Sequence, residues 1–235
     1  MKKRDWKSIL AKIVLVSFII PIAYLIYRLI VAPEINSEHI EGLRVKADYA
    51  LMIVQCLLGI LAMAIPSIVS KKAKIIIPSN MYIVFLLFLY CAIFLGEVTS
   101  FYYKFEYWDV MLHAISSGML GALGFSLIDL LNKQEKIRME LSPMFVTLFA
   151  FCFAVTLGAI WEIYEFTWDG ILNLNMQKYA LENGIQLVGR AALQDTMKDI
   201  IVDCIGAFIM SVIGYISLKY KKEWLEKVLI KRKSS

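Results

Sequence analysis

Six apolar runs of about 20 residues dominate this sequence, and each is long enough to cross roughly 30 Å of hydrocarbon as a helix. They lie near 12–32, 49–70, 79–97, 108–131, 143–167 and 198–219. Hydrophobic residues make up 60% of the 235 residues and charged residues only 19%, a balance far from that of soluble domains. The sequence therefore predicts an all-α, polytopic membrane helix bundle of about six transmembrane helices, folded as a single integral-membrane domain over 1–235.

The cationic residues are unevenly distributed between the connecting segments. Most of the 25 Lys and Arg lie in 2–12, 71–74, 133–138 and after the last run. Because short cytoplasmic loops retain positive charge during insertion, we expect a multi-pass protein of the cell membrane with both termini in the cytoplasm. The net charge of +5 is then an orientation signal. Since no basic stripe interleaves with aromatics, we expect membrane lipid and not nucleic acid as a partner.

Seven ionisable side chains interrupt three of the apolar runs. They are Asp109 and His113, then Glu162 and Glu165, then Asp195, Asp199 and Asp203. An acid near the bilayer centre costs about 2.5 to 3.5 kcal/mol on insertion scales, so such residues usually face a bundle interior and mark a functional site. Spacings of three and four residues place the members of each group on one face of their helix. With the predicted orientation, all three groups converge toward the outer leaflet.

The helical rise of 1.5 Å per residue gives the depth of these side chains. An inner tier, about five residues or roughly 7 Å inside the helix ends, consists of His113, Glu162 and Asp203. A second tier, about one turn nearer the surface, consists of Asp109, Glu165 and Asp199, with Asp195 higher still. The two tiers predict a site that opens toward the outer surface.

Carboxylates crowded beside one imidazole repel one another in a poor dielectric unless protons or cations neutralise them. A divalent metal ion satisfies this requirement, and oxygen ligands with one imidazole favour Mg²⁺, Mn²⁺, Fe²⁺ or Zn²⁺. The expected metal ligands are His113, Glu162, Asp199, Asp203 and Asp195. The expected catalytic proton acceptors are Glu165 and Asp109. The candidates for holding an anionic substrate are Arg190 and Lys198, with solvated surface charges as the alternative, and the long loop near 169–197 could cover the site.

Three strings in the second half of the chain resemble the YjdF-like family of bacterial inner-membrane proteins. They are residues 108–113, 162–165 and 194–199, followed by Gly206-Ala207. The family likewise pairs a W-D-x-x-L-H helix with an E-x-x-E helix and a D-T-x-x-D helix start, although its members often carry glutamine where this chain has Met197. More distantly, the same order of acids and histidine looks like the VanZ-like proteins linked to glycopeptide antibiotic resistance. The resemblance implies a membrane protein with a polar site in the outer leaflet.

Three functions are compatible with these residues. The first is a metal-dependent hydrolase or transferase that acts on a lipid or envelope precursor, with the ion polarising a phosphoryl or acyl oxygen. The second is an ion- or proton-coupled transporter. The restriction of the acids to one half of the membrane argues against it. The third is a non-catalytic structural or regulatory protein whose ion ties helices together. Removing the metal would lower stability in the third case, whereas an enzyme would keep its fold and lose turnover.

Overall fold

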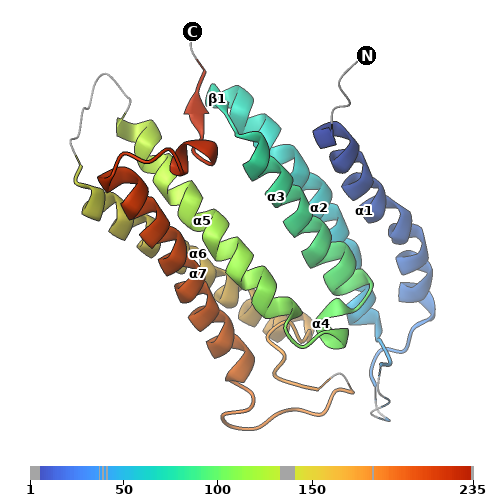
Figure 1. The fold of residues 1–235 in the computed structure, drawn as a ribbon. Helices are drawn as coiled ribbons and strands as arrows, with labels where there is room; N and C mark the ends of the chain where they lie inside the picture. Colours follow the sequence, from blue (N-terminus) through green and yellow to red (C-terminus); the bar gives the residue numbers. More distant parts are fainter. Residues whose placement is uncertain are drawn as a thin grey trace.

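The fold is known from a computed structural model, which describes residues 6–233 except 37, 39, 41, 133–140 and 182. In this part of the chain, six helices are long and apolar enough to cross a membrane. They are α1 (Trp6–Val31), α2 (Lys46–Lys72), α3 (Ser79–Leu89) with its π-helical continuation η1 (Tyr90–Val98), α5 (Trp108–Asn132), α6 (Pro143–Leu172) and α7 (Gln194–Lys219). A short helix, α4 (Phe101–Lys104), precedes α5. The expected all-α helix bundle is confirmed (Figure 1).

Two helices are longer than the apolar runs that predicted them, and their additional residues come from the predicted long loop. Helix α6 begins where the Ser142 hydroxyl accepts a hydrogen bond from Phe145 N at 3.2 Å, and it ends at Leu172, before Asn173, whose φ of 53° is left-handed. Helix α7 begins at Gln194, four positions before the predicted start. The connection is therefore 173–193, shorter than expected, and both polar helix ends are ordered.

The helices form two groups of three. Helices α1, α2 and α3 share one core, which contains Phe18 and Leu86. Helices α5, α6 and α7 pack against one another more closely than any other helices in the described chain. Small residues allow this approach: a Cβ at Gly124 of α5 would lie only 2.9 Å from the Ala150 Cα of α6, which is the close backbone contact typical of membrane helices.

The segment after α7 folds back against the bundle and connects the two groups. Its strand β2 (Lys231–Arg232) pairs antiparallel with β1 (Ile75–Ile76), which follows α2. Between α7 and β2, the 3-10 helix η2 (Leu225–Lys227) buries Leu225, and the Ile230 N–H donates to Ser126 Oγ at 3.2 Å. The end of the bundle that carries β1 and β2 is here called the tail end (Figure 1).

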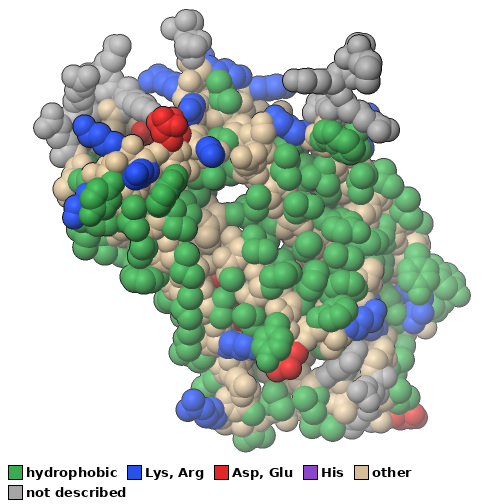
Figure 2. Space-filling model, viewed as in Figure 1, with side chains coloured by type: hydrophobic (Ala, Val, Ile, Leu, Met, Phe, Trp, Pro, Cys, Tyr) green, Lys and Arg blue, Asp and Glu red, His purple; other side chains and the backbone are tan. Residues whose placement is uncertain are grey.

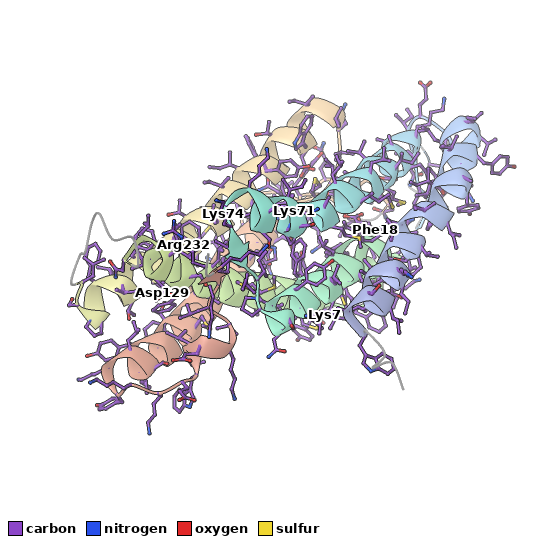
Figure 3. All side chains as sticks on the ribbon, turned by 90° about the horizontal axis from the view of Figure 1, so that it is seen from above. Lys7, Phe18, Lys71, Lys74, Asp129 and Arg232 are labelled. Carbon is purple, nitrogen blue, oxygen red and sulfur yellow. The ribbon has the colours of Figure 1, made fainter. Side chains whose placement is uncertain are left out.

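Basic side chains gather at the tail end. Among them are Lys71 of α2, Lys74, which directly precedes β1, and Arg232 of β2 (Figure 3). Figure 2 shows Lys and Arg concentrated along the same end. The predicted basic residues of 2–4 and 133–138 lie outside the described residues. The start of α1 lies at the tail end too, as an even number of crossings requires.

Candidate functional site

The opposite end of the bundle, here called the loop end, carries the buried ionisable residues. Helix α5 begins there, α6 ends there and α7 begins there, and the segment 173–193 crosses it (Figure 1). Among the described residues, the buried acidic and histidine side chains are His113, Glu162, Asp169, Asp199 and Asp203. All five lie on the three helices that the sequence singled out, so their burial gathers charge at one end of an apolar bundle.

His113 lies between two carboxylates from different helices. Its Nδ1 is 3.3 Å from Asp203 Oδ1 of α7, and its Nε2 is 3.8 Å from Asp109 Oδ1, one turn earlier on α5. Gly158 of α6 leaves the space for this arrangement, because a Cβ there would collide with the Asp203 carboxylate. The imidazole is therefore oriented by groups from three helices.

Asp109, His113 and Asp199 form the most compact group of potential ligands. One ligand atom from each lies within 4.8 Å of the others. Asp199 is only 2% exposed, and its Oδ1 has no hydrogen-bond partner in the described part of the chain. A buried carboxylate oxygen without a partner is costly, so this oxygen is free to accept a ligand. The group mixes the two predicted tiers, since it pairs inner His113 with outer Asp109 and Asp199.

Lys178 reaches this group from the loop. Its Nζ contacts Asp109 Oδ2, lies 3.2 Å from Asp195 Oδ1, and is 5.7 Å from the ring centroid of Tyr102. Burial alone would lower the pKa of Lys178, but the charges of the two carboxylates outweigh it and raise the pKa above its ordinary value. The side chain is therefore a permanent cation, and it neutralises part of the acidic charge.

The segment 173–193 is held against α6 by a carboxylate that the sequence did not predict as a site residue. Asp169, only 5% exposed near the end of α6, accepts hydrogen bonds from Met176 N at 2.8 Å and Gln177 N at 3.0 Å. The Gln177 Nε2 in turn donates to Thr196 Oγ1 at 2.9 Å and lies 3.4 Å from Glu162 Oε2. These bonds hold residues 176–178 over the site.

The other predicted site residues have separate surroundings. Glu165 accepts a hydrogen bond from Trp161 Nε1 of its own helix at 2.9 Å. Arg190 is exposed on the loop, and Lys198 lies 5.4 Å from the ring centroid of Tyr107. The structure thus places Lys178, and not these two cations, against the carboxylates. The sequence could signal Lys178 only as a cation inside a long loop.

Comparison with known proteins gives a family but no solved fold. The family described as "Predicted membrane protein (DUF2238)" matches residues 13–220. An uncharacterized protein of Thermotoga maritima is 33% identical over 122 residues, which cover 52% of this chain and 54% of that protein. The chain thus aligns with about half the length of this relative. No solved structure matches.

Proposed function

Since the chain belongs to the DUF2238 family of predicted membrane proteins and has six candidate spans, it is a multi-pass membrane protein, and we propose that its loop end binds a divalent cation. The YjdF-like motifs at 108–113, 162–165 and 194–199 are consistent with this family, and they contain most of the residues concerned. On the distribution of Lys and Arg, we place the loop end at the outer face of the cell membrane, with both termini in the cytoplasm.

The unpartnered oxygen of Asp199 carries this proposal. It lies in a group with Asp109 and His113 whose ligand atoms are within 4.8 Å of one another, a separation that one ion coordinated at about 2.0 to 2.5 Å spans. A carboxyl group this deeply buried is stable only when it is protonated, paired or bound to a cation. The cation would be Mg²⁺, Mn²⁺, Zn²⁺ or Fe²⁺, given oxygen ligands and one imidazole.

Asp203 then acts through His113. Metal-binding histidines usually donate their second ring N–H to a carboxylate, which fixes the tautomer and the direction of the other nitrogen. The 3.3 Å contact from Nδ1 to Asp203 supports this role and leaves Nε2 toward Asp109. Glu162 is an additional candidate ligand at the loop end, because its Oε1 is buried and has no hydrogen-bond partner among the described residues. Asp195 contacts Lys178 through Oδ1, while its Oδ2 is unpartnered among the described residues, so Asp195 stays a candidate ligand.

The reaction we favour is hydrolysis or transfer at a lipid or envelope precursor. A bound divalent ion would polarise a phosphoryl or acyl oxygen and lower the pKa of water. Because Asp109 is already occupied by Lys178 and the ligand group, Glu165 is the better of the two proton acceptors. Lys178, which contacts Asp109, is placed to attract an anionic group to the carboxylates, in addition to Arg190 and Lys198, the two cations expected to hold the substrate.

Metal analysis of the purified full-length protein tests the cation site. We expect near-stoichiometric metal in the wild type, strong loss in Asp199→Asn and His113→Gln, and wild-type content in the control Glu226→Gln, which is exposed at the tail end. Asp203→Asn should lower affinity about 10- to 100-fold without abolishing binding, as removal of an orienting partner does. Equal metal content in all five proteins would overturn the proposal.

Two further measurements separate catalysis from the alternatives. If the ion serves chemistry, Glu165→Gln should retain the metal and the melting temperature while it loses turnover on phospholipid or lipid-linked phosphate. If the ion serves only structure, chelation should lower the melting temperature and no turnover should be found. Cation flux in proteoliposomes that is lost in Asp199→Asn would favour the transporter instead.

A further inference from the structure

A groove between α5 and α7 lies beside the proposed cation site but contains none of its carboxylates. Its volume is about 410 Å³, and its lining is almost wholly apolar. It extends from Val110 and Val202 to Ile213, in the half of α7 nearer the tail end. Ile205 and Ile209, which line it, are each more than half exposed, so the groove faces the surrounding membrane.

Two glycines with opposite surroundings shape the groove. At Gly206 of α7, a Cβ would collide with Ser117 Oγ and lie 2.9 Å from the Ala114 carbonyl oxygen of α5. This close contact closes the floor between the helices. At Gly118 of α5, by contrast, nothing lies within 4 Å of the position of a Cβ. The missing side chain at Gly118 therefore leaves open a trough that almost any other residue would narrow.

The outer end of the groove carries a positive charge. Lys198 lies one turn before Val202 on the same face of α7, and its Nζ is 5.4 Å from the ring centroid of Tyr107, the residue before α5. A cation and an aromatic ring at the membrane surface, followed by an apolar trough toward the membrane interior, match a molecule with an anionic headgroup and a long hydrocarbon chain.

The length of the trough supports the same occupant. From Val202 to Ile213 the helical rise is roughly 16 Å, about half of the roughly 30 Å hydrocarbon thickness. This length is about the hydrocarbon thickness of a single leaflet. A soluble anion would use Lys198 alone, and a neutral lipid would use the trough alone, whereas an anionic lipid uses both.

We propose that the groove between α5 and α7 binds one acyl chain of a lipid with an anionic phosphate headgroup, and that Lys198 contacts the phosphate. This inference rests on the proposed function for the reaction site and deepens it, because it names the substrate class. Lys198 precedes Asp199 on α7, and Val110 of the groove follows Asp109 on α5, so the groove and the proposed cation site lie at the same ends of these two helices.

Native mass spectrometry of the full-length protein, released from nanodiscs with equal amounts of phosphatidylglycerol and phosphatidylcholine of the same chain length, tests this proposal. The wild type should retain phosphatidylglycerol in preference. Gly118→Leu should lower retention about tenfold, as expected when roughly two methylene groups lose their apolar contact. Gly170→Leu is the matched control, because Gly170 of α6 also has open space at its Cβ. Lys198→Gln should reduce the preference for the anionic lipid about fivefold.

Equal lipid retention in Gly118→Leu and Gly170→Leu would overturn the groove as the binding place. An unchanged preference in Lys198→Gln would overturn the assignment of the headgroup contact. Metal content is measured on the same samples, and we expect it to be unaffected by either groove variant. A wild type that retains anionic lipid but no metal would refute the cation site and leave the groove supported, so the two proposals can fail separately.

Discussion

Replacing Asp169 by Asn should release the loop that holds Gln177 and Lys178 over the site. The carboxylate accepts two buried backbone N–H groups at 2.8 and 3.0 Å, and an Asn side chain offers only one acceptor oxygen. One N–H then loses its partner, which costs about 1 to 3 kcal/mol. A loss of about 2 kcal/mol corresponds to roughly 30-fold faster local opening.

Amide hydrogen exchange of Met176 and Gln177 measures this opening. We expect exchange at both amides to accelerate roughly 30-fold in Asp169→Asn, and acylation of the Lys178 amine to increase in parallel. Thr167→Ala is the control, because Thr167 bonds only to Ile163 O of its own helix. Unchanged exchange at the two amides, or equal acceleration in the control, would refute the view that Asp169 anchors the loop.

Two other substitutions test the packing around the site and at the tail. Gly158→Ala places a methyl group against the Asp203 carboxylate and should destabilise the protein by about 1 to 3 kcal/mol, seen as a lower melting temperature than that of Gly170→Ala, where the Cβ meets open space. Ser126→Ala removes the acceptor of the Ile230 N–H, which costs about 1 to 2 kcal/mol. Proteolysis should then cleave the C-terminal segment faster while the helices remain intact, and equal cleavage in wild type and variant would contradict this expectation.

The membrane helices were predictable because length and hydropathy are local properties. The errors lie where polar residues continue a helix beyond its apolar run: Asp169 was assigned to the loop but belongs to the end of α6, and α7 begins at Gln194, before the expected start of the last apolar run. The pairing of Ile75 with Arg232 had no local signal, because the partners are more than 150 residues apart.

The site was predictable to the extent that it depends on helical spacing. A four-residue interval places Asp109 and His113 on one face of α5. The equal depth expected for His113 and Asp203 agrees with the 3.3 Å between His113 Nδ1 and Asp203 Oδ1. Lys178 and Gln177 could not be placed in this way, because a loop has no period from which direction follows. The compact group contains His113 with Asp109 and Asp199, and not with Glu162 and Asp203, the other members of the expected inner tier. Which acids lie nearest depends on how each helix is rotated about its axis, and the sequence alone does not specify this rotation.

The pairing of β1 with β2 has a consequence for how the protein is made. Strand β1 leaves the ribosome early, whereas β2 is among the last residues of the described chain. The first three spans must therefore persist in the bilayer without this partner until β2 has been synthesised, and the pairing of β1 with β2 can form only after all six spans have been made. We expect chains arrested before residue 231 to insert all six spans and to lack this pairing, while α3 and η1 still contact α5.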